Sequence, residues 1–183
     1  TSQTSAANIA ITATQGNATT SKAAVVTPGT LAITANTNAA QTLVNDAGQL
    51  NAAQLQINVS ILSNTSKGEI VQTGTGTTTI ATNGTLNNDG GRIASNGQDL
   101  TLQGMAVTSN AGKIEHAGTG TLTIAGGSFN GANGRITTNN ALAVSLSSAF
   151  NQDGGATSAK QITIDAGSLS NKGGQIVQTG ADA

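Results

Sequence analysis

Residues that could carry out chemistry are few in this chain, and their spacing brings almost none of them together. Only 8% of the 183 residues are charged, and His116 is the single histidine. A Ser-His-Asp arrangement would need a hydroxyl and a carboxylate beside His116, and nothing in the sequence places them there. We expect His116 to be an exposed residue of a Thr/Gly-rich turn without a catalytic role.

Metal binding needs several ligands at a defined spacing, and the chain offers one adjacent pair, Glu115-His116, with no cysteine. The Gly-Gly-x-Gly-x-Asp repeat that binds calcium in other β-rolls is also missing. Arg92 follows Gly90-Gly91, and Ala156 follows Gly154-Gly155, where that repeat requires a different pattern. We therefore predict no metal ion and no cofactor.

Carboxylates could serve a polysaccharide-cleaving enzyme if several gathered on one face. Asp46, Asp89 and Asp153 share one position, three residues after a large apolar residue. They are two or three repeats apart, which is roughly 10 to 14 Å at the spacing of β-strands, wider than a paired-carboxylate glycosidase wants. We interpret them as turn residues that cap their own backbone, and we expect no enzyme.

One column of charges follows the repeat more closely. Glu69, Arg92, Lys113 and Arg135 each stand between a glycine and an isoleucine, so they should stack on successive repeats, with Glu69 able to pair with Arg92. One interpretation is a solvated stripe that discourages association between sheets. The other is a shallow contact for an anionic glycan or lipopolysaccharide through Arg92, Lys113 and Arg135.

These positions belong to a repeat that recurs every 19 to 23 residues, as in Leu86-Asn-Asn-Asp-Gly-Gly-Arg-Ile93. A second motif keeps the same period and alternates apolar and polar residues, from Ile9-Ala-Ile11 to Ile162-Thr-Ile164. Alternation with a period of two predicts strands, and the Asn, Asp, Gly and Ser between them predict turns. A repeat of this length is one supersecondary unit that stacks on its neighbours.

The sequence therefore predicts an all-β fold, a right-handed parallel β-helix with three short parallel sheets, about 21 residues per coil and about eight rungs. Three interior columns should form its core. The first holds Leu43, Leu62, Leu86, Val107, Phe129, Phe150 and Leu169. The second holds Leu50, Ile70, Ile93, Ile114, Ile136 and Ile176. The third holds Ile11, Ile33, Ile57, Ile80, Leu102, Ile124, Val144 and Ile164.

Stacking also predicts contacts within these columns. Phe129 and Phe150 fall on adjacent rungs, so we expect an offset stack of their rings. Two positions after the first column, a series of mostly amide side chains should bond from rung to rung. Gly131 lies in this series and should interrupt it. The series is Asn45, Asn64, Asn88, Ser109, Gly131, Gln152 and Asn171.

Composition limits the partners and the setting. The net charge of -1 and the lack of a basic-aromatic pattern argue against nucleic acid. No apolar run is long enough for membrane insertion, and we recognise no signal peptide. We expect residues 1–183 to be a single β-helix segment of a longer array, because Gly174 to Gly180 restarts the text of Gly68 to Gly74. Residues 1–40 are less regular than residues 41–180.

Two stretches of the sequence resemble the haemagglutinin-type repeats of filamentous haemagglutinin and related two-partner-secretion exoproteins. They are Leu86 to Leu102 and Gly118-Thr-Gly-Thr-Leu-Thr-Ile124. The resemblance runs from about Leu43 to Gly180. It implies a β-helical filament that an outer-membrane two-partner-secretion transporter exports to the surface of a Gram-negative cell. Some members of this class adhere to host cells, and the sticks of contact-dependent growth-inhibition proteins carry toxins at their far end.

Four functions are compatible with the sequence. The first is a structural segment that extends an adhesive or toxin-bearing region from the cell. The second is an adhesin whose own surface binds a host-cell glycan or receptor, or a neighbouring bacterial cell. The third is a carbohydrate-active enzyme, for which an acid-base cluster is missing. The fourth is ice binding through threonine ranks, but the Thr-x-Thr runs at Thr75 to Thr79 and Thr119 to Thr123 do not recur on every rung.

Overall fold

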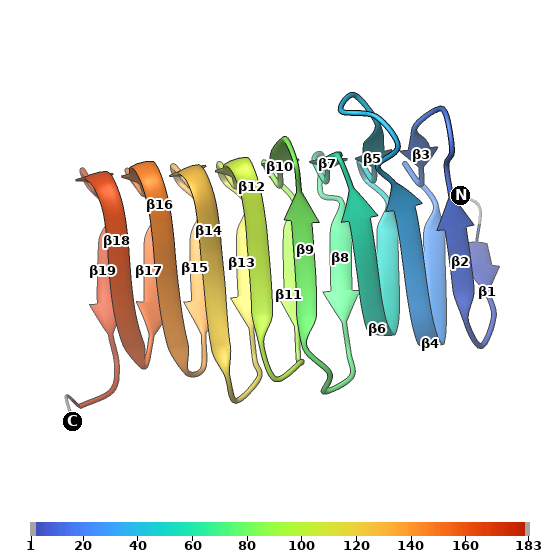
Figure 1. Ribbon diagram of the computed structural model, residues 1–183. Coiled ribbons are helices and arrows are strands. Elements are labelled where there is room, and N and C mark those ends of the chain that lie inside the picture. Colours follow the sequence, from blue (N-terminus) through green and yellow to red (C-terminus); the bar gives the residue numbers. More distant parts are fainter. Residues whose placement is uncertain (1–2, 182–183) are drawn as a thin grey trace.

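The computed structural model describes residues 3–181 and shows one parallel β-solenoid (Figure 1). It has about eight turns of about 22 residues, and the described residues contain no helix. The expected all-β stacked fold is confirmed. The coils follow one another along a rod, with the two ends of the chain at its opposite ends (Figure 1). At about 4.8 Å per coil, eight coils span about 40 Å.

Each coil has three strand positions, and each position pairs in parallel with its equivalents in the coils before and after. Short strands occupy the first position in the early coils: β3 (Ala18–Thr19), β5 (Thr42–Val44), β7 (Ile61–Ser63) and β10 (Thr85–Asn87). The second position holds β1 (Gln3–Ser5), β8 (Glu69–Gln72), β11 (Arg92–Ser95), β13 (Lys113–His116), β15 (Arg135–Thr138), β17 (Ala156–Ala159) and β19 (Gln175–Gln178). The third position holds β2 (Ile9–Thr12) and β9 (Thr78–Thr82).

Some strands are longer than the sequence predicts because they run through a corner. Two early strands join the second position to the third: β4 (Ala24–Ala35) and β6 (Gln49–Val59). Four later strands join the third position to the first position of the next coil: β12 (Leu100–Thr108), β14 (Thr121–Asn130), β16 (Ala141–Asn151) and β18 (Gln161–Ser170). Irregular register at these corners, as between Gly126 and Phe129, lets the backbone bend without ending the strand.

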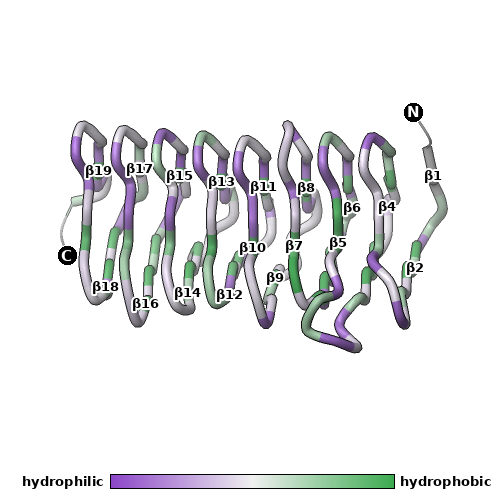
Figure 2. The backbone as a smooth tube through the Cα atoms, turned by 90° about the horizontal axis from the view of Figure 1, so that it is seen from above, coloured by the Kyte–Doolittle hydropathy of each residue, from purple (hydrophilic) through white to green (hydrophobic). Residues whose placement is uncertain are grey.

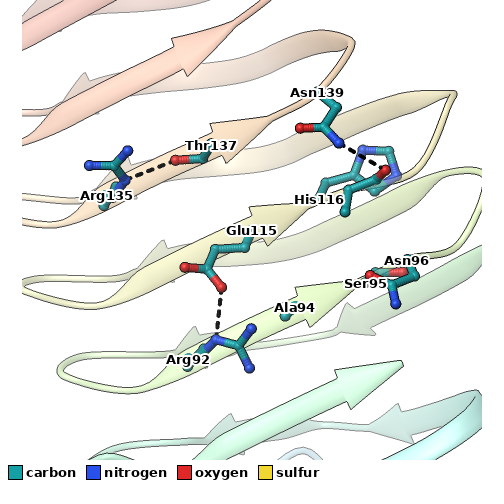
Figure 3. Close-up of a pocket in the computed structure, with 10 residues that line it drawn as sticks. Arg92, Ala94, Ser95, Asn96, Glu115, His116, Arg135, Thr137 and Asn139 are labelled. Carbon is teal, nitrogen blue, oxygen red and sulfur yellow. Dashed lines mark hydrogen bonds and ion pairs between the residues drawn. The ribbon is translucent and has the colours of Figure 1, made fainter. Parts of the chain in front are cut away.

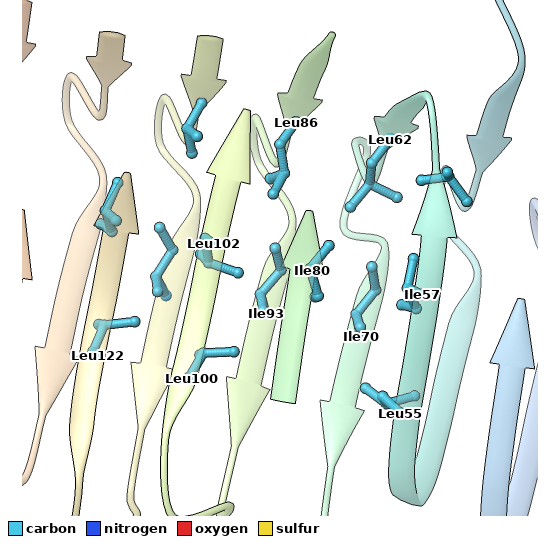
Figure 4. Close-up of a cluster of buried hydrophobic side chains, with 14 of the residues drawn as sticks. Leu55, Ile57, Leu62, Ile70, Ile80, Leu86, Ile93, Leu100, Leu102 and Leu122 are labelled. Atoms are coloured by element: carbon cyan, nitrogen blue, oxygen red, sulfur yellow. The ribbon is translucent and has the colours of Figure 1, made fainter. Parts of the chain in front are cut away.

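Apolar side chains at equivalent positions fill the interior of the coils (Figure 4). Ile93 lies in register with Ile70 on one side and Ile114 on the other, and all three are at most 1% exposed. Because alternate residues of a strand point to opposite faces, the same strands present their polar residues to solvent. The hydropathy colouring in Figure 2 shows this alternation of polar and apolar segments around each coil.

Burial in the three columns falls at the ends of the rod. Leu169, expected in an interior row, is in register with Phe150 but is 54% exposed, so the expectation of burial is wrong. Ile11, Ile164 and Ile176 are only partly buried. The reason is that an end coil is covered from one side only within the described residues, whereas every inner coil is covered from both.

The early, less regular residues continue the same columns with smaller side chains. Ala18 pairs with Leu43, and Val25 pairs with Leu50; both early residues are buried. The substitution of alanine for the usual large residue made the first motif unrecognisable there in the sequence. These members of the first and second columns are identified by their strand register and not by their residue type.

Two stacking predictions are confirmed inside the rod. The rings of Phe129 and Phe150 stack with centroids 5.2 Å apart and an angle of 18° between their planes. Asn45 Nδ2 donates to Asn64 Oδ1 at 2.8 Å, and Asn64 Nδ2 donates to Asn88 Oδ1 at 2.7 Å. Asn88 Nδ2 continues the series to Ser109 Oγ at 3.0 Å, after which Gly131 has no side chain to extend it.

Candidate functional site

A shallow groove of about 240 Å³ crosses the outer face of β11, β13 and β15 (Figure 3). Its walls carry Arg92, Glu115 and Arg135, with Asn96, Thr137 and Asn139 beside them. The chain has only two arginines, two glutamates and one histidine, and both arginines, one glutamate and the histidine line this groove. The groove therefore holds most of the chain's rare side chains that could bind or react with a ligand.

The parallel register explains why these side chains share one face. Arg92, Lys113 and Arg135 are paired on successive coils and point outward, because the isoleucine after each of them points into the core. Two residues further along each strand lies a second outward column, in which Ala94 pairs with Glu115 and Glu115 with Thr137. Ala94 is small, so it leaves a depression between the longer side chains around it.

Arg92 crosses this depression to reach the next coil. Its Nε donates to Glu115 Oε2 at 2.8 Å, and both side chains are 36% exposed (Figure 3). The expected pair between Glu69 and Arg92 is wrong, although the two residues are in register. The guanidinium reaches diagonally toward the second outward column, where Glu115 stands opposite the small side chain of Ala94.

The three cations of the expected column do not all line one groove. Arg135 Nε donates to Thr137 Oγ1 at 3.0 Å, which turns this guanidinium into the same groove as Arg92. Lys113 instead lines a neighbouring groove of about 270 Å³ with Lys67 and Glu69. Arg92 lies on the border between the two grooves because it lines both.

His116 is buried and lies in strand β13, so the expectation of an exposed turn residue is wrong. Its Nε2 is 2.9 Å from the carbonyl oxygen of Gly97, and its Nδ1 is 3.1 Å from Thr138 Oγ1. A carbonyl only accepts, so Nε2 carries the proton, and Nδ1 can accept from the threonine hydroxyl. The imidazole thus links three successive coils, and its place in the groove wall is structural.

The repeated turn aspartates link neighbouring coils. Asp46 Oδ1 accepts from the Thr65 backbone and the Ser63 hydroxyl, and Asp89 Oδ1 accepts from the Asn110 backbone. The expectation that they cap their own backbone is therefore wrong. The next coil approaches within one strand spacing, so its amides are as close as the local ones.

Hydrogen bonds to Asp153 and Asp46 favour the charged form of these two carboxylates. The hydroxyl of Ser170 and the backbone amide of Lys172 lower the pKa of Asp153; burial opposes them, and the charge of Lys172 lowers this pKa further. Burial raises the pKa of Asp46, but the hydrogen bonds from Thr65 and Ser63 outweigh it, so that pKa also lies below its ordinary value. These aspartates stabilise the stack and do not form a paired site.

Within residues 3–181, no group of three or more His, Asp or Glu side chains is placed to hold a metal ion. The same residues include no helix long and apolar enough to cross a membrane.

The sequence identified all three cations but not which of them act together. Alternation along Ile114-Glu115-His116 does carry the missing signal, since it places Ile114 and His116 inside and Glu115 outside. Applied to that strand, it would have put His116 in the wall and Glu115 in the groove. The turn of Arg92 toward Glu115 has no such signal, because it depends on the free space above Ala94.

Part of this chain is similar in sequence to a known protein. A stretch of 69 residues, 38% of this chain, is 52% identical to a protein named Toxin CdiA from Yersinia pestis. That stretch corresponds to 2% of the length of the relative, so the chain spans a small part of it. No family model matches the chain, and no solved structure matches it. The chain is thus a β-solenoid segment related in sequence to part of a toxin protein.

Proposed function

We propose that this chain is a structural segment of a long exported protein, a stick that holds an adhesive or toxin-bearing region away from a Gram-negative cell. The observation that carries the proposal is the uninterrupted stack of coils. The buried asparagines, His116 and the turn aspartates each bond to a neighbouring coil. The relationship to part of a toxin protein supports the same setting. Export would use an outer-membrane two-partner-secretion transporter.

The outer surface supports this role. The first and third strand positions present mainly Thr, Ser, Asn, Gln and Ala, as in the paired column Thr79, Thr101 and Thr123. Such a surface is soluble and offers no acid-base cluster. A rod whose only function is to hold another region away from the cell needs no more than continuous hydrogen-bonded strands between coils and a filled core.

The proposal is tested by removing a whole coil. Ile70 and Ile93 are in register, so deletion of residues 71–93 joins Ile70 to Ala94 and restores every column with one coil fewer. We expect the shortened protein to fold and to reach the cell surface, as seen by immunogold electron microscopy of bacteria that produce the full-length protein. Deletion of residues 71–82 is the matched control, because it places Ile70 before Asn83 and destroys the register.

Two results would contradict the proposal. One is loss of surface display after removal of residues 71–93 despite a folded rod, which would mean that this coil carries more than reach. The other is immunogold label confined to the inside of the cell, which would reject the exported setting.

A second candidate function is direct adhesion by the rod itself. The concentration of both arginines in one groove favours it. In this function the cations Arg92, Lys113 and Arg135 would contact a glycan or receptor on a host cell or a neighbouring bacterium. Retained binding after replacement of all three by alanine, in a variant that still folds, would reject it.

A further inference from the structure

We propose that the groove across β11, β13 and β15 binds a single carboxylate-bearing sugar residue of an acidic polysaccharide. This inference deepens the second candidate function, and it does not depend on the role of the rod as a stick. It rests on three features of the groove: the nitrogens its arginines leave unused, its charge, and its hydrogen-bond acceptors.

The first feature is the orientation of the two guanidinium groups. Each is held through Nε alone, Arg92 by Glu115 and Arg135 by Thr137. Among the described residues, the terminal nitrogens of both make no hydrogen bond. A guanidinium held in this way presents a planar pair of donors, which matches the two oxygens of a carboxylate. Arg135 is the more exposed of the two, so we place the carboxylate there.

The second feature is the charge of the groove. Its two arginines and Glu115 together carry one net positive charge. Arg92, Lys113 and Arg135 follow one another in one column, but Glu69 precedes them in that column and Glu115 stands in the next outward column. A densely sulfated chain laid along the cations would therefore also meet these two carboxylates. The arrangement therefore favours one anionic group over a polyanion.

The third feature is a set of acceptors suited to sugar hydroxyls. The amide nitrogen of Asn139 donates to the carbonyl of Ala117 at 3.1 Å, and that of Asn96 is 3.5 Å from the carbonyl of Thr73. Both amide oxygens are therefore left as acceptors at the edge of the groove. Glu115 Oε1 is a third acceptor, because Arg92 engages Oε2. A site with donors for one anion beside acceptors for hydroxyl groups is complementary to an acidic sugar.

The site offers no exposed aromatic ring on which a sugar could stack, because the chain has no Tyr or Trp, and both phenylalanines and the ring of His116 are buried. Binding of one sugar residue should consequently be weak, and a surface carrying many acidic chains would hold the rod through several contacts.

Titration of the whole chain, followed by ¹H–¹⁵N nuclear magnetic resonance, tests the proposal with three probes. A hyaluronan tetrasaccharide supplies carboxylates without sulfate, a chitin tetrasaccharide is the neutral control, and a heparin tetrasaccharide is the sulfated one. We expect hyaluronan to shift the amides of Glu115, Thr137 and Asn139, and chitin to leave them unchanged. Arg135→Gln should weaken binding at least about tenfold, the effect of losing a charge-assisted pair of hydrogen bonds.

Lys113→Gln is the matched variant, because it removes a neighbouring cation of the same column that faces the other groove. It should weaken binding by less than about twofold. Equal losses from the two variants would overturn the proposal in favour of unspecific charge attraction, and tighter binding of heparin than of hyaluronan would replace it with a polyanion surface. Absence of shifts with any probe would reject the site while leaving the stick function, which the coil deletion tests separately.

Discussion

Gly131 lies against the ring of Phe129, and this contact explains why the internal amide series stops. A side-chain carbon at Gly131 would lie 2.5 Å from Phe129 Cε1 and 2.6 Å from Gln152 Oε1. The ring of Phe129 thus occupies the room that an asparagine side chain uses in earlier coils. The first column thus contains a stacked aromatic pair, and the neighbouring amide series is interrupted at this coil.

This relationship predicts that Gly131→Ala destabilises the rod by about 1–3 kcal/mol, the usual cost of overpacking a filled core. Urea denaturation followed by circular dichroism measures the loss. Phe129→Leu should recover part of it in the double variant, because the smaller side chain frees the space. Gly16→Ala is the control, since nothing lies within 4 Å of the added carbon there. Additive effects of the Gly131 and Phe129 substitutions would contradict the contact.

The amide series itself predicts a cost for its interruption at a coil where no ring replaces it. Asn64→Leu removes the donor to Asn88 Oδ1, whereas Asn45 Nδ2 keeps the carbonyl of Glu69 as a partner. One buried acceptor left without a partner should lower the free energy of unfolding by about 1–3 kcal/mol. The same denaturation experiment on Asn83→Ala, at an exposed turn position, should show almost no change. Equal stability of both variants would mean that the series is not a stabilising network.

The fold is predictable from the sequence because the apolar residues recur periodically. Ile70, Ile93 and Ile114 recur at nearly the same spacing, and such a spacing admits few arrangements other than stacked coils. The Phe129–Phe150 stack is predictable in the same way, because it follows from register alone.

The contacts that the sequence did not predict depend on distances between coils. The text of a single turn cannot show that Asp46 is close to the amide of Thr65, nor that Arg92 turns to Glu115 and not to Glu69. The true partner in each case lies on the neighbouring coil, and the choice among several near neighbours is made by side-chain size and free space. The candidate groove was therefore only partly predictable.

The bonds between coils also predict a response to acid. Because the pKa of Asp153 is lower in the folded chain than in the unfolded one, its contribution to stability is present above the unfolded pKa and is lost as pH falls through the folded pKa. Stability should therefore decline below about pH 4, and Asp153→Asn should show a smaller decline between pH 6 and pH 3. Urea titrations at the two pH values measure this. Ser170→Ala, which removes the first partner of the carboxylate, should change the response in the same direction.

The interior columns predict the most severe effect of a single substitution. Ile124 is fully buried between Leu102 and Val144, its register partners in the third column. Ile124→Asp would place a carboxylate where no cation or hydrogen-bond donor faces it, at a cost of several kcal/mol. Thr123→Asp is the matched control, because Thr123 is the preceding residue of the same strand and points outward.

We expect Ile124→Asp to abolish cooperative thermal unfolding, measured by far-ultraviolet circular dichroism, and Thr123→Asp to melt close to the unmodified chain. Ile124→Ala should fold with a loss of about 2–5 kcal/mol, which separates the missing volume from the added charge. An unchanged melting temperature for Ile124→Asp would contradict the assignment of this column to the core. Since every coil supports its two neighbours, a fault at this coil should also weaken β12 and β16, on either side of β14.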